Sequence, residues 1–214
     1  MATYRVTYKK RNFSKKELQD IAISVVTLSV ALFLIIIRSS FKVNGINVHP
    51  ALLLALAIGF LMTITAFLIH EMSHKFTAIH YGAWSEFRMW PMGLVLTIIT
   101  GLIGFLFALP GAVYFASYRN PIREGKIALA GPIANMVMGI VLLPVLLFVT
   151  MPLNAFAAVF FLVYINLWLG LFNLVPIPPL DGSKVFAWNK MYWGITFAVA
   201  AVLVGYFFIS FGIL

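Results

Sequence analysis

The stretch from Ala51 to His74 reads ALLLALAIGFLMTITAFLIHEMSH, an apolar run that ends in two histidines and a glutamate. The spacing of His70, Glu71 and His74 places two imidazoles about one helical turn apart on one face, with a carboxylate beside them. Three ionisable side chains at membrane depth are costly unless a metal, a partner or a water-filled cavity compensates them. The stretch therefore predicts a membrane helix with a zinc site, since His-Glu-x-x-His is a signature of zinc hydrolases.

The composition of the whole chain favours a membrane protein. Of the 214 residues, 63% are hydrophobic and only 10% are charged, and the mean hydropathy is +1.02. So few charges could not cover the surface of a soluble domain of this size. No stretch is long or polar enough for a second domain, so we expect one membrane-embedded domain over residues 1–214. The chain lacks cysteine, so a metal must be bound by His, Asp or Glu.

The apolar runs predict an all-α polytopic membrane protein with small β-hairpin or strand elements. A capping box at Ser14-x-x-Glu17 is expected to open the first helix. Membrane helices are predicted over residues 21–37, 51–81, 122–149, 155–174 and 193–214. Strands are predicted around Asn44-Gly45, which is a hairpin signal, within 85–92 and at 112–116.

The run from Gly93 to Leu109 decides whether there are five or six crossings. If all six apolar runs cross, the Lys and Arg residues divide into eight inside and seven outside. If this run enters and returns on one side, thirteen lie inside and two outside. The positive-inside rule therefore favours five crossings with a re-entrant segment, and places the N-terminus and the site in the cytoplasm. Gly101-x-x-Gly104 would also suit helix packing in a sixth crossing.

Net charge bears on partners as well as on topology. The formal net charge is +9. The basic residues are not interleaved with a recognition motif, so we expect no nucleic-acid partner. Their pattern instead indicates charges that hold cytoplasmic loops beside the lipid bilayer.

Zinc hydrolysis needs three protein ligands and an open position for water. His70 and His74 supply two ligands, and Glu71 is the natural general base. Asp181 is favoured as the third because, with five crossings, the helix before it ends on the same side as the His70 helix. His80 is the alternative, but on a continuous helix it would lie about 15 Å along the axis from His70.

Two asparagines are further candidates. Asn135 and Asn173 each place an amide on a membrane helix, where it needs a hydrogen-bond partner. Asn173 lies eight residues before Asp181, so we favour it as a donor to the substrate carbonyl. Helix packing is the alternative for both, and it is as well supported for Asn135 as a functional role.

Three motifs occur in order along the chain: His70-Glu71-x-x-His74, Gly131-Pro132-x-x-Asn135, and Asn173-x-x-Pro176 leading to Leu180-Asp181-Gly182. In this order they resemble the site-2 protease family of intramembrane zinc metalloproteases. The resemblance implies one Zn²⁺ per chain, held by His70, His74 and Asp181, with Glu71 as the base. It also implies that Asn173 positions or polarises the scissile carbonyl, and we expect Asn135 to contact the substrate.

The family cleaves transmembrane helices of other membrane proteins, often to release a transcription factor or an anti-sigma factor. The resemblance therefore implies a multi-pass protease of the cell membrane that acts on a transmembrane protein in regulated intramembrane proteolysis. Neither a PDZ nor a CBS domain fits this sequence, and no pattern indicates an oligomeric state. A membrane zinc transporter and a non-proteolytic membrane scaffold are the alternative functions; a transporter would favour several sites along a pore, whereas one ligand cluster is found.

A helical substrate hides its peptide bonds and must unwind before attack. We expect the short strands near Asn44-Gly45 and at 112–116 to bind the unwound segment as an added strand.

Overall fold

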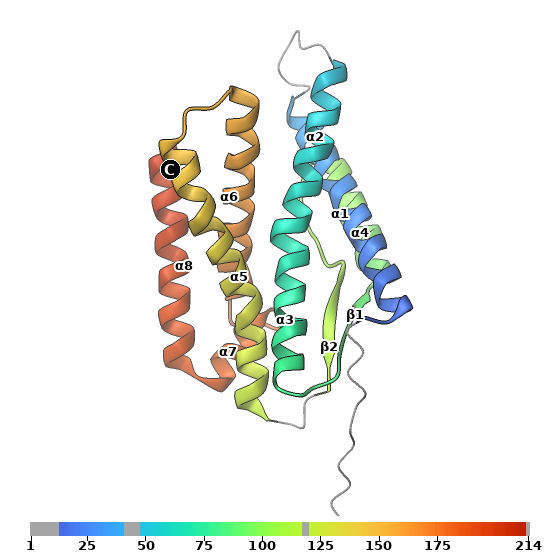
Figure 1. Cartoon of the computed structure of the whole chain (residues 1–214), viewed down its shortest axis with the longest axis vertical. Helices are drawn as coiled ribbons and strands as arrows, with labels where there is room; N and C mark the ends of the chain where they lie inside the picture. The colour runs from blue at the N-terminus through green and yellow to red at the C-terminus, as the bar shows by residue number, and fades with distance from the viewer. Residues whose placement is uncertain (1–12, 41–47, 117–119, 213–214) are drawn as a thin grey trace, which may run out of the picture.

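The structure, a computed structural model, describes residues 13–40, 48–116 and 120–212 and is mostly helical (Figure 1). Its elements in chain order are α1 (Lys15–Ser40), α2 (Val48–Met62), the π-helical η1 (Thr63–Leu68), α3 (Ile69–His80), β1 (Ser85–Met89), α4 (Pro91–Ile103), β2 (Gly111–Phe115), α5 (Pro121–Phe148), α6 (Leu153–Asn173), α7 (Asp181–Trp188) and α8 (Lys190–Ser210). This confirms the predicted all-α fold with small β elements, while the predicted hairpin at Asn44-Gly45 lies outside the described residues.

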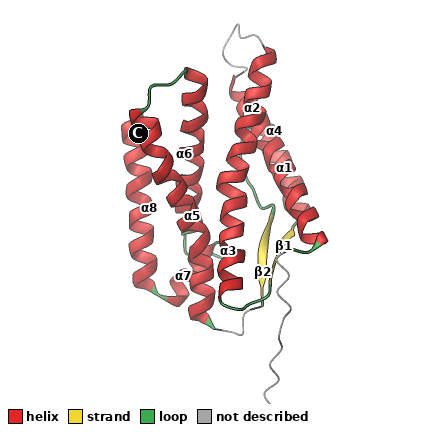
Figure 2. Cartoon of the chain, viewed as in Figure 1, coloured by secondary structure: helices red, strands yellow, loops and turns green. Residues whose placement is uncertain are grey.

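Within the described residues, five helical stretches are long and apolar enough to cross a membrane: Lys15–Arg38, Leu52–His80, Pro121–Phe148, Leu153–Asn173 and Lys190–Ser210. In the view of Figure 1, α1, α5 and α8 rise from the lower end of the bundle, whereas α2 to α3 and α6 descend to it. The two strands and α7 lie in the lower half, beside or below α3 (Figure 2). The lower end of the bundle is therefore where α3 ends and where α7 follows α6.

The segment from Gly93 to Leu109 leaves the lower half of the bundle and returns to it. Helix α4 has 13 residues, so it is about 20 Å long and too short to span a hydrocarbon core of about 30 Å. It ends at Gly104, whose φ of 89° is left-handed. Trp90 N–H donates to the Pro110 carbonyl at 2.9 Å, so the two ends of the segment are adjacent. The structure thus agrees with five crossings and a re-entrant segment.

Polar side chains inside the re-entrant segment satisfy part of its backbone. Thr100 Oγ1 accepts a hydrogen bond from Phe107 N–H at 3.2 Å, and Thr97 Oγ1 donates to the Gly93 carbonyl at 2.8 Å and lies 3.3 Å from the Phe107 carbonyl. A Cβ atom on Gly93 would overlap the Leu109 carbonyl, so the returning chain can pack against α4 only at a glycine. Such internal pairing is what a non-helical segment at membrane depth requires.

The predicted capping box at Ser14-x-x-Glu17 forms in its first half, where Ser14 Oγ accepts from Glu17 N–H at 3.1 Å. The Glu17 carboxylate instead binds Lys75 Nζ at 2.8 and 3.0 Å and accepts from Phe87 N–H at 2.9 Å. Glu17 and Lys75 are completely buried, so Lys75, one of the thirteen cations counted as inside, forms a buried ion pair. The ion pair ties α1, α3 and β1 together and thereby places the sheet beside α3.

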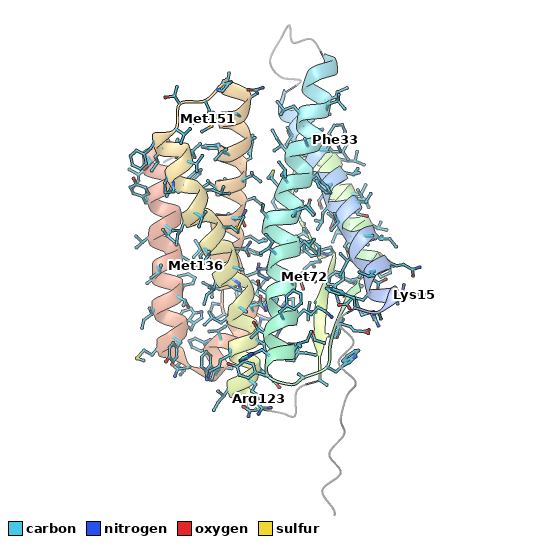
Figure 3. The ribbon with its side chains drawn as sticks, viewed as in Figure 1. Lys15, Phe33, Met72, Arg123, Met136 and Met151 are labelled. Carbon is cyan, nitrogen blue, oxygen red and sulfur yellow. The ribbon has the colours of Figure 1, made fainter. Side chains whose placement is uncertain are left out.

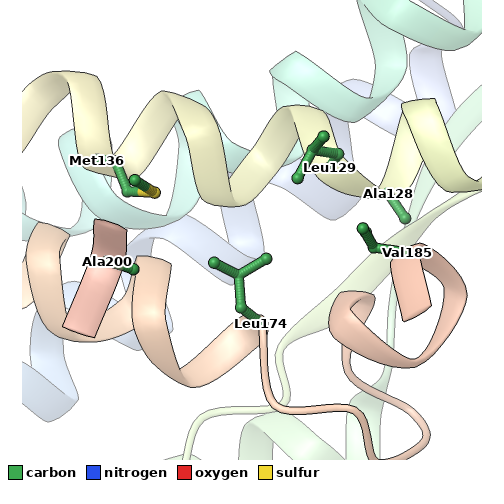
Figure 4. Close-up of a cluster of buried hydrophobic side chains, with 6 residues drawn as sticks. All are labelled: Ala128, Leu129, Met136, Leu174, Val185 and Ala200. Carbon is green, nitrogen blue, oxygen red and sulfur yellow. The ribbon is translucent and has the colours of Figure 1, made fainter. Parts of the chain in front are cut away.

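A cluster of buried side chains from α5 to α8 holds α7 in place, and its members are Ala128, Leu129, Met136, Leu174, Val185 and Ala200 (Figure 4). A Cβ atom on Gly125 would overlap Trp188, and one on Gly182 would overlap the Leu174 carbonyl. A larger residue at either position would force the packed segments apart, so both close contacts require glycine. Because α7 packs closely against these residues, the position of its first residue, Asp181, is fixed.

Candidate metal centre

Three electron-donating atoms meet in the lower half of the bundle. His70 Nε2 lies 3.0 Å from His74 Nε2, and Asp181 Oδ2 lies 3.2 Å from the first and 3.0 Å from the second. All three residues are buried, and each offers a ligand atom within 4.8 Å of the others. The structure therefore brings together the three ligands predicted from the sequence, two from α3 and one from α7.

Hydrogen bonds on the far side of each imidazole determine which nitrogen carries the proton. His74 Nδ1 lies 2.7 Å from the Ile127 carbonyl, which only accepts, so Nδ1 is the protonated nitrogen. His70 Nδ1 lies 2.5 Å from Asn135 Oδ1, and the Asn135 amide nitrogen donates to the Ala66 carbonyl at 2.9 Å. Both rings therefore direct an Nε2 lone pair toward Asp181.

Two lone pairs and a carboxylate oxygen this close repel one another unless a cation lies between them. Zinc bonds of about 2.0–2.2 Å in tetrahedral geometry separate ligand atoms by about 3.3–3.6 Å. The distances of 3.0 to 3.2 Å among His70, His74 and Asp181 are slightly shorter than this range. Two imidazole nitrogens and one carboxylate also form the ligand set of catalytic zinc sites, which leave a fourth position open. The residues present therefore fit Zn²⁺.

The backbone of α5 passes directly over the ligand atoms at Gly131. A Cβ atom on Gly131 would overlap Nε2 of His74 and closely approach Nε2 of His70. Only glycine leaves space for an ion beneath the helix at this position. This gives a physical reason for the Gly131-Pro132-x-x-Asn135 motif that spacing along the sequence could not reveal.

Charge around Asp181 favours its ionised form. The carboxylate faces His70 and His74 through Oδ2. Lys184 Nζ lies 3.7 Å from the other carboxylate oxygen, Oδ1. An ionised carboxylate is the form that binds a metal.

Glu71 and Asn173 line the same cavity, of about 210 Å³, as the three clustered residues. Glu71 Oε2 accepts a hydrogen bond from Val113 N–H of β2 at 3.0 Å. Asn173 Nδ2 donates to the Leu169 carbonyl of its own helix at 3.1 Å. Above the polar residues the cavity is apolar, with walls that include Leu28, Leu32, Met62, Leu106, Ile165 and Leu169.

Two candidates lie elsewhere. His80 is exposed and contacts the ring of Tyr81, so it does not join the cluster. Asn135 is completely buried behind His70 and does not line the described cavity. This position favours a role in orienting His70 over the substrate contact predicted from the motif, because the Asn135 amide is already used by protein groups.

Asn166 is a polar residue that the sequence analysis overlooked. It accepts a hydrogen bond from Asn135 at 3.1 Å and is completely buried in α6. The signal was present, since an amide within an apolar membrane helix needs a partner.

The sequence is similar to known zinc metalloproteases. The sequence model of Peptidase family M50 matches residues 149–211, which contain α6, α7 and α8. "Putative zinc metalloprotease MJ0611" of Methanocaldococcus jannaschii is 37% identical over 196 residues, covering 91% of this chain and 94% of that protein. The chain belongs to peptidase family M50. This confirms the family indicated by the three motifs.

Other relatives of this M50 chain align over a smaller part. "Putative zinc metalloprotease Rip2" of Mycobacterium tuberculosis is 32% identical over 161 residues, covering 64% of this chain and 60% of that protein. "Putative zinc metalloprotease YwhC" of Bacillus subtilis is 31% identical over 143 residues, covering 57% and 64%. No solved structure matches the chain.

Proposed function

We propose that this M50 chain is an intramembrane zinc metalloprotease that cleaves peptide bonds within transmembrane segments of other membrane proteins. Its family and the names of its relatives support the coarser assignment, a membrane zinc metalloprotease. The observation that carries the finer proposal is the cluster of His70, His74 and Asp181 beside Glu71, in a cavity between membrane helices. Cleavage of a selected substrate in regulated intramembrane proteolysis is part of the proposal.

Each polar residue of the cavity has a role in the proposed reaction. His70, His74 and Asp181 would hold Zn²⁺, which would act as a Lewis acid that activates water and polarises a carbonyl. Glu71 holds Oε2 against Val113 N–H, so Oε1 is the oxygen that takes the proton from the attacking water. Glu71 can then deliver this proton to the leaving amine.

Asn173 is proposed as the donor to the scissile carbonyl. Its side chain lines the cavity, and its Nδ2 now donates to the Leu169 carbonyl. Because the amide carries two N–H groups, the second can donate to the substrate as negative charge develops on the carbonyl oxygen.

The edge of β2 that faces away from β1, toward the cavity, is the proposed binding site for the unwound substrate. In the antiparallel pairing, Phe87 faces Val113, and Ala116 N–H donates to the Trp84 carbonyl. This register turns Val113 N–H away from β1 and toward Glu71. The corresponding edge of β1 is occupied by Glu17 and Lys75. An added strand is therefore expected on β2, beside the catalytic residues.

Replacing Phe115 with proline tests the edge. Phe115 faces Ser85 in the same register as Val113, so Phe115→Pro removes an N–H that points away from β1 and leaves the Val113 bond to Glu71 in place; we expect cleavage to fall by about tenfold or more. Zinc content, measured by elemental analysis, should stay at the wild-type level, and the control Phe115→Ala, which keeps the N–H, should cleave faster than Phe115→Pro. Equal cleavage by the two variants, or parallel loss of zinc and cleavage, would contradict a binding role for the strand.

We further propose that the lower end of the bundle faces the cytoplasm. Lys15 and Arg123 lie toward this end, whereas Phe33 and Met151 lie toward the other (Figure 3). Among the described residues every Lys and Arg except Arg38 belongs to the lower half, as the positive-inside rule requires for a cytoplasmic face. Lys184→Cys protein should react with an impermeant thiol reagent only from the cytoplasmic side; labelling from outside would contradict this orientation.

The test of the proposed function is metal-dependent cleavage. Purified protein in detergent is incubated with a fluorescent transmembrane substrate, with and without a zinc chelator. Cleavage that stops with chelator and returns with Zn²⁺ supports the protease. Zinc flux into liposomes without cleavage would instead support the transporter, and a stable, zinc-free, inactive protein would support the scaffold.

A further inference from the structure

A chain of hydrogen bonds runs behind His70 through three neighbouring elements. His70 Nδ1 bonds to Asn135 Oδ1, and Asn135 Nδ2 donates to Asn166 Oδ1 at 3.1 Å. Asn166 Nδ2 in turn donates to Thr65 Oγ1 at 3.1 Å. Asn135 and Asn166 are both completely buried, so water does not compete for these bonds.

We propose that Asn166 is a positioning residue for the metal centre: acting through Asn135, it fixes the tautomer of His70 that leaves Nε2 free to bind the ion. The proposal rests on the metal site proposed above and adds a residue from α6 that belongs to none of the three motifs.

The direction of each hydrogen bond in this series follows from counting donors and acceptors. Asn166 Nδ2 has two N–H groups, and these go to Thr65 Oγ1 and to the Leu162 carbonyl at 2.9 Å. Thr65 Oγ1 uses its own hydrogen toward the Leu61 carbonyl at 2.9 Å, so it can only accept from Asn166. Oδ1 of Asn166 must therefore face Asn135 as an acceptor.

The orientation of Asn166 sets that of Asn135. The two N–H groups of Asn135 donate to Asn166 Oδ1 and to the Ala66 carbonyl. A rotated Asn135 amide would set its oxygen against both acceptors at once. It would also present N–H groups to His70 Nδ1, which would then carry the lone pair while Nε2 carried the proton. That tautomer cannot bind a metal through Nε2.

Helix packing is a competing role for Asn166, because amides join membrane helices in general. The two roles differ in what they predict. A packing role lowers the stability of the fold and changes metal affinity only as much as any comparable loss of stability. A positioning role lowers metal affinity in protein that remains folded.

The experiment measures Zn²⁺ affinity by competition with a chelator, alongside thermal unfolding of the metal-free protein. Asn166→Leu is expected to weaken binding about 10-fold, the lower end of the range found when a group bonded to a metal-bound histidine is removed, because Asn166 acts on His70 through Asn135. Leu167→Ala is the matched control, since Leu167 is the next residue of α6, is also buried and packs on Gly139. It should lower stability and leave Zn²⁺ affinity at the wild-type level.

Two further measurements separate the roles. Asn166→Asp keeps the acceptor that faces Asn135, so it should bind Zn²⁺ more tightly than Asn166→Leu. Nitrogen-15 spectra of labelled histidine in the metal-free protein should show the Nδ1–H form of His70 in the wild type and its loss in Asn166→Leu. If Asn166→Leu does not fold, Thr65→Val is used instead. It removes only the last acceptor in the series of hydrogen bonds and should still weaken Zn²⁺ binding.

Equal Zn²⁺ affinities in the wild type and in folded Asn166→Leu, or in Thr65→Val if that variant is needed, would overturn the positioning role and leave the metal centre intact. An equal loss of affinity in Leu167→Ala would also overturn it in favour of packing. Failure of the wild type to bind Zn²⁺ would overturn the metal centre itself, so the two proposals fail by different results.

Discussion

Glu71→Gln protein is expected to bind Zn²⁺ like the wild type and to cleave its substrate about 10²- to 10⁴-fold more slowly, the range contributed by a general base. The glutamine has the same shape, and its amide oxygen can accept the hydrogen bond that Val113 N–H now donates to Glu71 Oε2. It cannot take a proton from water at neutral pH. The measurement is cleavage of a transmembrane substrate by protein whose zinc content has been determined.

Glu124→Gln is a suitable control for the loss of a carboxylate. Glu124 lies in the first turn of α5 and is not among the residues that line the cavity. This variant should retain both zinc and activity. An active Glu71→Gln protein would remove the assignment of Glu71 as the base, and an inactive protein without zinc would instead place Glu71 among the groups that retain the metal.

Gly131→Ala is expected to lower Zn²⁺ affinity by about 100-fold or more. This equals or exceeds the largest loss of affinity that is typical when a residue supporting a metal ligand is changed. The added methyl group would occupy the space beside the Nε2 atoms of His74 and His70, where the ion is proposed to lie. The loss of affinity should appear as less than one zinc per purified chain, and activity should fall with it.

The same helix offers a matched control in Gly139→Ala. The methyl group there would meet the flexible end of Leu167 rather than a proposed metal ligand. This variant should cost some stability, measured by thermal unfolding, and keep its zinc. Wild-type zinc affinity in Gly131→Ala would be incompatible with an ion bound beneath α5 and would require a different metal position.

Local features of the sequence were predictable because they depend on neighbouring residues alone. Length and hydropathy define the five spanning helices. Helical spacing fixes His70 and His74 relative to each other, whatever surrounds α3. The link to Asp181 needed one global inference, the positive-inside count, which placed the ends of two distant helices on the same side.

Contacts between elements could not be predicted in this way. Lys75 was counted only as one of the inside cations, but the fold pairs it with Glu17, 58 residues away. The sheet pairs β1 with β2 across the re-entrant segment, and the register that turns Val113 toward Glu71 follows from that pairing. No pattern within either strand determines these partners.

The amino-acid sequence by itself determined a membrane-embedded helical protein, its family and the residue types that could hold a metal, since hydropathy, spacing and motif order act along the chain. Only the tertiary structure decided that Asn135 lies behind His70, that Asn166 lies behind Asn135 and that Gly131 leaves space for an ion. These relations depend on how closely separate helices approach and on which donor meets which acceptor. Such distances arise from packing and are not encoded in the spacing of residues along one helix.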